Sequence, residues 1–421
     1  MKPEPNPLWH AQADMHRIDC ARRVITRGEG AYVWSADGHR ALDLPAGLWF
    51  CAVGHGRGEI VDAVASQMRQ LASYSNFQQY ATAPALELAE RLAALAPLSG
   101  AKVMLTSNGS DAVDAAAKLA RRYWSAVGRP GKRCLVARSS GYHGLHGFGT
   151  GLGGIERNRE GLDEVIKGIT HVPYDDADAF EVLLENAGDA IAAFFCEPVM
   201  GTGGVLLPPD GYLKRVQAAC RRHDVLFVVD EVITGFGRTG SLFACERFGL
   251  RPDIMLFAKC VTSGYMPLGG MLVGERVAEP FWSQEKPLVF RHGLTYQGHA
   301  GSCAAALANL EILEREGLVD RGRSLEHALK TAFGQLDRDP SVLAVRSGVG
   351  LMAGIELVDA RTAARVVDRC WELGVVTRLL GDGRVLHVSP AFVIEKAELF
   401  DAAALMAEAI AAVRPETPAP A

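Results

Sequence analysis

Two hydrophobic patterns alternate in the middle of the chain. Short runs of almost wholly apolar residues occupy positions 134–137, 191–196, 225–229 and 254–257. Stretches with an apolar residue every three or four positions, such as 111–124 and 211–223, alternate with these runs. Wholly apolar strands separated by helices are typical of a parallel sheet that is covered on both faces. The pattern therefore predicts an α/β fold with a mostly parallel central sheet covered by helices.

The two ends of the chain follow a different pattern. Residues 31–34 and 41–44 flank an Asp-Gly turn, which predicts a β-hairpin. Toward the C-terminus helices and strands alternate again, which is typical of a smaller α+β unit. We predict that an N-terminal segment, 1–60, contributes to this small domain. Residues 61–310 are expected to form the large domain, and residues 311–421 the C-terminal small domain.

Composition and charge narrow the class of protein. The chain has 421 residues, 48% hydrophobic and 22% charged, as in soluble globular proteins. Its 44 Lys and Arg residues stand against 49 Asp and Glu residues, so there is no basic excess for binding nucleic acid or an anionic membrane surface. Nine cysteines without a CxxC pair indicate neither a disulfide framework nor a metal site.

The termini and the longest apolar runs bear on location. The N-terminus carries prolines and charges where a signal peptide would have an apolar core, and no apolar run approaches the ~18 residues of a membrane span. Residues 414–421 have the composition of a disordered tail. We expect a cytoplasmic protein that acts on small molecules.

Three polar features stand next to apolar segments. Small polar residues at 105–112 precede an amphipathic helix, where free backbone N–H groups can bind an anion or simply be capped. Asp230 ends the run 225–229, so its carboxylate can hold a protonated ring nitrogen or a metal, or cap a turn. Lys259 follows the run 254–257 and precedes small residues, where poor solvation lowers the pKa of its amine and makes it a nucleophile.

These three features together fit pyridoxal 5′-phosphate. This cofactor needs a phosphate site, a carboxylate for its pyridine nitrogen and a lysine for a Schiff base. A rival motif, GxGxxG at 149–154, does not directly follow a strand, so we interpret it as a flexible glycine-rich loop, with a nicotinamide site as the alternative. The P-loop, HExxH and GxSxG motifs are absent from the sequence.

The same segments resemble the class III pyridoxal-phosphate-dependent aminotransferases of fold type I. Residues 107–112 are similar to the family's SGSEA phosphate loop, which implies that Gly109 and Ser110 bind the phosphate. Residues 141–144 resemble its YHG segment, which implies that Tyr142 stacks on the cofactor ring. Residues 229–240 nearly reproduce the family signature. They give Asp230 the pyridine nitrogen and Val232 the opposite face of the ring.

Two further matches complete the implied site. Residues 257–259, followed by Pro-Leu-Gly-Gly at 267–270, assign Lys259 the Schiff base and the proton transfer. Residues 295–299 resemble a TxxGHP stretch in which a threonine, here Thr295, reaches the cofactor phosphate of the neighbouring subunit. The resemblance therefore implies a homodimer with composite active sites.

Departures from the family pattern bear on the substrate. Thr202 stands where ornithine-type members have a glutamate, and His387 where their substrate-binding arginine is expected. These differences argue against acetylornithine, ornithine and 4-aminobutyrate as donors. Residues around Trp49 and Arg378 instead resemble the ω-amine:pyruvate group, in which the Trp lines the pocket and the Arg holds the acceptor's carboxylate.

Alternatives stay open for these substrate residues. Two residues are inserted after Arg378 relative to that group, so Arg384 is a rival for its role. Trp49 could equally belong to the core, and Arg378 could be a surface charge.

We expect transamination between an amine or ω-amino compound and a keto acid, with pyruvate as the acceptor, in two half-reactions through Lys259. An aminomutase or an amino-acid racemase or epimerase is the main alternative, because these enzymes share the fold and the cofactor residues. A nicotinamide oxidoreductase and a cofactor-binding protein without catalysis are the remaining ones.

Overall fold

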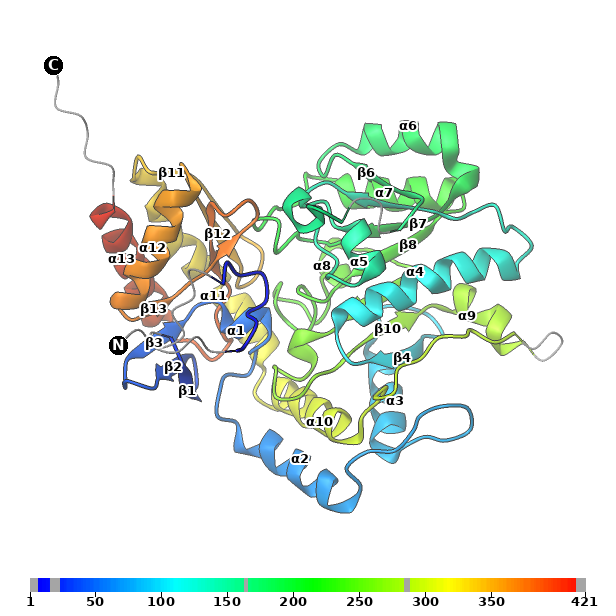
Figure 1. Cartoon of the computed structure of the whole chain (residues 1–421), viewed down its shortest axis with the longest axis horizontal. Coiled ribbons are helices and arrows are strands. Elements are labelled where there is room, and N and C mark those ends of the chain that lie inside the picture. Colours follow the sequence, from blue (N-terminus) through cyan, green and yellow to red (C-terminus); the bar gives the residue numbers. More distant parts are fainter. Residues whose placement is uncertain (1–6, 16–22, 163–165, 284–287, 414–421) are drawn as a thin grey trace.

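The computed structural model describes residues 7–15, 23–162, 166–283 and 288–413. The tail at 414–421 that the composition marks as disordered lies outside the described residues. Figure 1 shows a larger unit built around the middle of the chain and a smaller one that contains both ends of the described chain. No helix in the described ranges is long and apolar enough to cross a bilayer.

A seven-stranded sheet forms the centre of the larger unit. In spatial order its strands are β4 (Lys102–Thr106), β10 (Gly269–Val273), β9 (Ile254–Phe257), β8 (Leu226–Asp230), β7 (Ile191–Cys196), β5 (Cys134–Arg138) and β6 (Ile169–Val172). The strands from β9 to β6 pair in parallel, and β10 is antiparallel to both of its neighbours. The predicted α/β fold with a mostly parallel sheet is confirmed.

Helices cover both faces of this sheet, because successive side chains of its strands enter two separate cores. In β8, Leu226 and Val228 pack with the first core, while Phe227 and Val229 pack with the second. The first core contains α4 (Gly109–Ala126) and α9 (Glu275–Trp282), and the second α6 (Ala177–Ala187) and α7 (Tyr212–Arg222). This two-sided burial explains why the central strands are apolar at every position.

The smaller unit contains two sheets. An antiparallel sheet has the order β11 (Val342–Ser347), β12 (Ala353–Leu357), β15 (Val385–Val388), β14 (Leu379–Leu380) and packs with α11 (Leu318–Gly334), α12 (Ala360–Glu372) and α13 (Lys396–Ala412). The other sheet joins β1 (Ile25–Glu29), β2 (Tyr32–Ser35) and β3 (Arg40–Asp43) to β13 (Val375–Val376). The predicted hairpin is confirmed as β2 and β3, and the pairing of β3 with β13 brings the two ends of the chain together (Figure 1).

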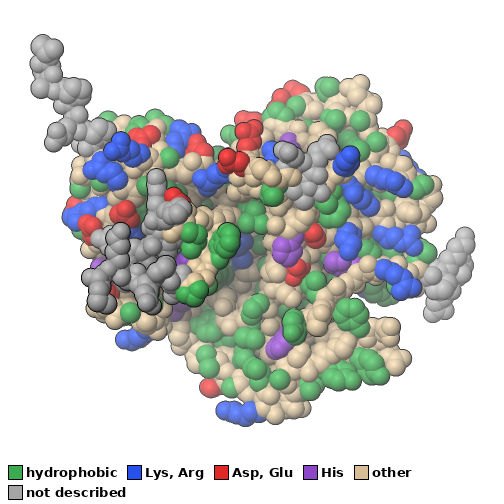
Figure 2. Space-filling view, in the orientation of Figure 1, with side chains coloured by type: hydrophobic (Ala, Val, Ile, Leu, Met, Phe, Trp, Pro, Cys, Tyr) green, Lys and Arg blue, Asp and Glu red, His purple; other side chains and the backbone are tan. Residues whose placement is uncertain are grey.

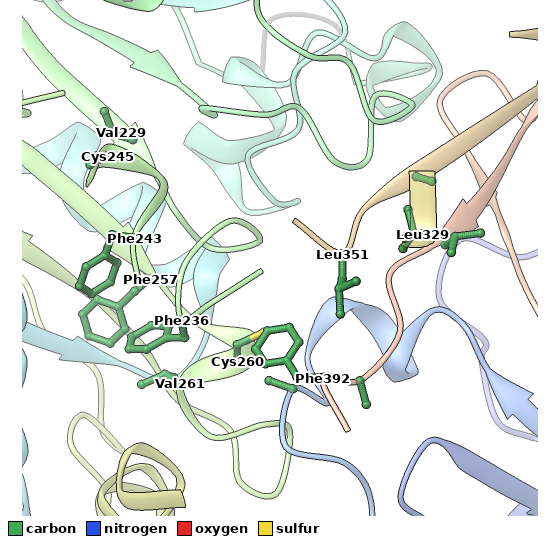
Figure 3. Close-up of a cluster of buried hydrophobic side chains, with 14 of the residues drawn as sticks. Val229, Phe236, Phe243, Cys245, Phe257, Cys260, Val261, Leu329, Leu351 and Phe392 are labelled. Atoms are coloured by element: carbon green, nitrogen blue, oxygen red, sulfur yellow. The ribbon is translucent and has the colours of Figure 1, made fainter. Parts of the chain in front are cut away.

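The remaining elements connect and support these sheets. The helices are α1 (Ala46–Trp49), α2 (Gly58–Gln70), α3 (Ala83–Leu95), α5 (Gly147–Leu152), α8 (Ala244–Phe248) and α10 (Ala300–Arg315), with 3-10 turns η1 (Glu156–Arg159), η2 (Gly188–Ala190), η3 (Lys259–Val261) and η4 (Gln335–Arg338). Figure 3 shows the second core continuing from Val229 and Phe257 in the large sheet past Cys260 to Leu351 and Phe392 in the smaller unit. The turn that carries Lys259 therefore lies where the two units meet.

Candidate active site

A cavity of about 470 Å³ lies at the carboxyl ends of the central strands. Parallel strands end at the same edge of a sheet, and ligand sites of open α/β sheets form there. Figure 2 shows the surface hollowed between the two units. Six residues that the sequence singled out line the cavity: Gly109, Ser110, Tyr142, Asp230, Val232 and Lys259.

Lys259 presents its amine from the turn that follows β9. Its backbone has a left-handed φ of 51°, and η3 begins at this residue. Burial lowers the pKa of the Lys259 amine, while the nearby carboxylates of Asp230 and Glu197 oppose this shift. A lowered pKa makes more of the amine neutral, which is the form that attacks a carbonyl carbon.

Asp230 is the last residue of β8, and two donors hold its buried carboxylate in place. Its Oδ1 accepts a hydrogen bond from the backbone N–H of Val232 at 3.0 Å, and its Oδ2 lies 2.8 Å from Nδ1 of His143. His143 is itself buried, so the pair is shielded from solvent. A fixed carboxylate at this place can keep a ligand's ring nitrogen protonated.

His143 and Glu197 are site residues that the sequence reasoning missed. The carboxylate of Glu197 is buried and accepts hydrogen bonds from the backbone N–H groups of Tyr142, at 2.9 Å, and Gly201, at 3.2 Å. Burial raises the pKa of Glu197. Through these two hydrogen bonds, Glu197 fixes the loop that presents Tyr142 to the cavity. In the sequence, His143 was marked only by its position next to Tyr142. Glu197 was marked only by its position at the end of an apolar strand.

The start of helix α4 also lines the cavity. The side chain of Asn108 accepts a hydrogen bond from the backbone N–H of Asp111 at 3.0 Å and so caps the helix. Gly109 is pressed against Val232, since a Cβ atom at position 109 would lie 2.8 Å from Cγ1 of that valine. The close approach leaves the first turn of α4 facing the cavity as a backbone cradle for an anion.

These features fit pyridoxal 5′-phosphate. One cavity contains a buried amine, a fixed carboxylate and a glycine-containing helix start, and these match the aldehyde, the ring nitrogen and the phosphate of this cofactor. Tyr142 and Val232 line the same cavity.

The structure does not bring the other predicted residues to the cavity lining. Thr295 is exposed on the surface of this chain. Trp49 is only 1% exposed, and its ring lies against that of His387 with 3.6 Å between centroids and 32° between the planes. His387 is also fully buried, and burial lowers its pKa well below the usual value.

Arg378 and Arg384 differ clearly in their surroundings. Arg378 is half-buried, and its charge acts on Tyr142 and Lys259, so it lies close to the cavity. Within the described ranges its guanidinium has no hydrogen bond or ion pair. Arg384 instead pairs with Asp382 at 2.7 Å and with Glu356 at 3.2 Å. Arg378 is therefore the one of the two that is free to bind a carboxylate.

The GxGxxG segment has a packing role. Residues 147–152 form the short helix α5, which lies against the loop that carries His143. A Cβ atom at Gly149 would lie less than 3 Å from the carbonyl oxygen of His143. The segment is thus an ordered helix where we predicted a flexible loop, because glycine allows it to pack closely on the Tyr142–His143 loop.

Comparisons with known proteins agree on one family. Residues 15–410 match the sequence model of the family described as Aminotransferase class-III. The putrescine–pyruvate aminotransferase of Pseudomonas aeruginosa is 37% identical over 407 residues, covering 90% of this chain and 88% of that protein. The ω-amino acid–pyruvate aminotransferase of Pseudomonas putida is 35% identical, covering 88% of each.

Solved structures give the same result. A transaminase from a marine Virgibacillus superposes with a TM-score of 0.92 at 33% identity, covering 97% of each chain. An (S)-enantioselective ω-transaminase from Thermomicrobium roseum has a TM-score of 0.89 at 35% identity, covering 96% of this chain and 95% of its own. The predicted family and fold are confirmed. The chain belongs to the class III aminotransferases, a pyridoxal-phosphate-dependent family of fold type I, and is an aminotransferase.

Proposed function

We propose that the cavity binds pyridoxal 5′-phosphate and that the enzyme transfers an amino group from an amine or ω-amino compound to pyruvate. The observation that carries this proposal is the meeting of Lys259, Asp230 and the start of α4 in one cavity. When bound, the cofactor supplies an aldehyde and a conjugated ring that accepts the electron pair left by a departing proton.

Each cavity residue has a defined task in this proposal. Lys259 would hold the aldehyde carbon of the cofactor through Nζ, and once a donor amine has taken its place, the free Lys259 amine would take up a proton from the substrate carbon. Asp230 holds the proton on the ring nitrogen, and His143 keeps that carboxylate in position at 2.8 Å. The N–H groups and hydroxyl at Gly109 and Ser110 bind the phosphate.

The cofactor ring would lie between two side chains in this arrangement. Tyr142 would pack on one face and Val232 on the other, and both line the cavity. Glu197 fixes the backbone of Tyr142 through its hydrogen bond to the Tyr142 N–H at 2.9 Å.

Arg378 is proposed to bind the carboxylate of the keto acid. An unpaired, half-buried guanidinium beside the cavity suits a small carboxylate, because Arg offers two parallel donors. The names of the relatives from Pseudomonas aeruginosa and Pseudomonas putida specify pyruvate, which supports pyruvate as the acceptor here. The same names favour transamination over the mutase and racemase alternatives.

A homodimer completes the proposal. Large apolar side chains are exposed near the loop between α2 and α3 and near the segment before α10: Met68, Leu71, Tyr74, Phe77, Tyr80, Val289 and Tyr296. Figure 2 shows hydrophobic side chains gathered on this lower part of the molecule. Thr295 is exposed among them, and we propose that it binds the cofactor phosphate of the partner subunit. The division at residues 60 and 310 is proposed as well, and the pairing of β3 with β13 supports it.

Spectroscopy and product analysis test this function. The wild-type protein with added cofactor should show the visible absorption of a lysine-bound cofactor, lose it when a donor amine is added alone, and regain it with pyruvate while alanine forms. Lys259→Ala should show none of these changes. A wild-type protein that gains no visible absorption, or whose absorption no donor amine alters, would contradict the proposal. Conversion of a substrate without any acceptor would support the isomerase alternative.

A further inference from the structure

Two neighbouring aromatic residues, Trp49 and Phe50, point into different parts of the molecule. Phe50 lines the cavity, whereas Trp49 belongs to a separate buried cluster behind it. The backbone between them is irregular: Gly47 has φ 66° and ψ −92°, and Trp49 has φ 69°. These angles are uncommon for L-residues, so the direction of each ring depends on specific contacts.

The indole of Trp49 is held away from the cavity. It lies against the ring of His387 at an interplanar angle of 32°, and His387 is fixed by a contact of 2.6 Å between its Nε2 and Oγ of Ser389. Burial lowers the pKa of His387 well below its usual value, which favours the neutral imidazole. The carbonyl of Trp49 accepts a hydrogen bond from Sγ of Cys260 at 3.2 Å, which ties this segment to the residue after Lys259.

The ring of Phe50 is clamped between two glycines. A Cβ atom at Gly47 or at Gly264 would lie less than 3 Å from ring carbons of Phe50. Both glycines have left-handed φ angles, 66° and 79°. The backbone at Gly47 and Gly264 therefore contacts the Phe50 ring directly, with no flexible side chain between them that could move aside. Gly264 also belongs to the same loop as Lys259. The ring can give little when a ligand contacts it.

We propose that Phe50, and not Trp49, limits the size of the substituent on the amine-bearing carbon of the donor. This inference rests on the proposed function, since it assigns the donor to the cavity beside Lys259. A linear primary amine places only hydrogens and one chain on that carbon, whereas an aryl-alkyl amine adds a second substituent inside the cavity that Phe50 and Lys259 both line. A steric mismatch of this size is commonly worth about 10-fold or more in kcat/KM.

Two probe amines with pyruvate test the proposal: butan-1-amine, which is linear, and 1-phenylethylamine, which is branched and aromatic. The measured quantity is the ratio of kcat/KM for 1-phenylethylamine to that for butan-1-amine. Phe50→Ala should raise this ratio by about 10-fold, and Phe50→Leu, which keeps an apolar side chain between the glycines, should raise it less. Trp49→Phe is the matched comparison and should change the ratio less than about 2-fold.

A binding measurement separates this inference from the proposed function. Calorimetric titration of the cofactor-free protein with acetophenone, the ketone formed from 1-phenylethylamine, needs no turnover and should show tighter binding in Phe50→Ala than in wild type. An unchanged ratio and unchanged acetophenone affinity in both Phe50 variants would overturn the inference, as would a larger change in Trp49→Phe. A wild-type protein that gains no visible absorption with added cofactor would instead count against the proposed function, and the acetophenone titration would still decide the role of Phe50.

Discussion

Asp230 and Lys259 face the same cavity, but their surroundings differ. Asp230 is bound to the backbone N–H of Val232 and to His143, which favours a carboxylate fixed in one orientation. Lys259 is buried with a lowered pKa, which favours a neutral amine. One residue can thus stabilise positive charge on a ligand ring, and the other can act as nucleophile and base.

Removing the charge of Asp230 should slow catalysis without abolishing cofactor binding. Asp230→Asn keeps an oxygen that can accept from the Val232 N–H but loses the negative charge, so we expect kcat to fall about 100-fold or more. Stopped-flow measurement of the half-reaction with a donor amine checks this. Asp253→Asn is the control, because Asp253 is another largely buried carboxylate that accepts a backbone hydrogen bond, from Phe227, outside the cavity. Equal rates in wild type and Asp230→Asn would contradict the assigned role.

The lowered pKa of Lys259 predicts a specific pH dependence. The neutral fraction of an amine rises as the pH passes through its pKa, so the cofactor-free protein should reach half-maximal labelling of Lys259 below the ordinary value of 10.5. Competitive acetylation with acetic anhydride, read by peptide mass spectrometry, measures this midpoint. The same lysine in denatured protein is the control. A midpoint at or above the denatured value would show that burial does not govern this amine.

The sequence predicted Lys259 and Asp230 because each follows an apolar strand, and parallel strands bring such ends together. It could not predict which aromatic residue faces the cavity, since the directions of Trp49 and Phe50 depend on left-handed backbone angles and on the distant His387. It also left open the choice between Arg378 and Arg384, and the ion pairs of Arg384 favour Arg378.

At the scale of elements, helix α10 supports the turn that carries Lys259. The side chain of Asn309 is fully buried, and its Nδ2 donates to the carbonyls of Cys260 at 2.9 Å and Val261 at 3.0 Å. Asn is a weak helix former, so Asn309 stabilises the structure through these two hydrogen bonds and not through its helix propensity. They hold η3 in place although Lys259 has an unfavourable φ of 51°.

Replacing Asn309 should therefore destabilise the fold. Asn309→Leu leaves two buried carbonyls without this donor, which should lower the free energy of unfolding by about 1–3 kcal/mol. Denaturant titration followed by circular dichroism measures the change. Asn186→Ala is the control, because Asn186 donates to a backbone carbonyl of its own helix at an exposed position, where the cost should stay within about 0.5 kcal/mol. Equal losses in the two variants would contradict the supporting role of α10.

The four strands that the sequence predicted are present as β5, β7, β8 and β9, with ends shifted by no more than one residue. Strand β10 was not predicted, because it begins with two glycines that are weak strand formers. Packing requires both: a Cβ atom at Gly269 would lie 2.5 Å from the carbonyl oxygen of Asn108, and one at Gly270 would lie 2.5 Å from the ring of Phe257. Tertiary contacts of this kind leave no local signal.

For the whole molecule, the two units are joined by buried contacts near the site. Arg238, from the segment after β8, donates to the carbonyls of Leu351, Ser389 and Pro390 at 3.3, 2.9 and 2.7 Å. The apolar core shown in Figure 3 crosses at the same place. The sequence predicted that both ends of the chain form one unit, but it could not show how that unit meets the large sheet, because the contact uses residues far apart in the chain.

The exposed apolar side chains predict association through the lower part of the molecule. Phe77→Asp should weaken the dimer by placing a charge in an apolar interface, with a loss of at least about 10-fold in affinity. Sedimentation equilibrium measures the dissociation constant. Val182→Asp is the control, since Val182 is exposed on α6, far from that patch in sequence. A wild-type monomer at all concentrations, or equal dissociation constants for the two variants, would contradict the proposed interface.

Lys259 is proposed to form the covalent link to the cofactor. Sodium borohydride fixes such a link irreversibly, so the wild-type protein can be incubated with pyridoxal 5′-phosphate, reduced, digested and analysed by peptide mass spectrometry. We expect one cofactor on the peptide that contains Lys259 and no label at that peptide in Lys259→Ala. Stoichiometric label on another lysine, or none on the wild-type Lys259 peptide, would contradict it.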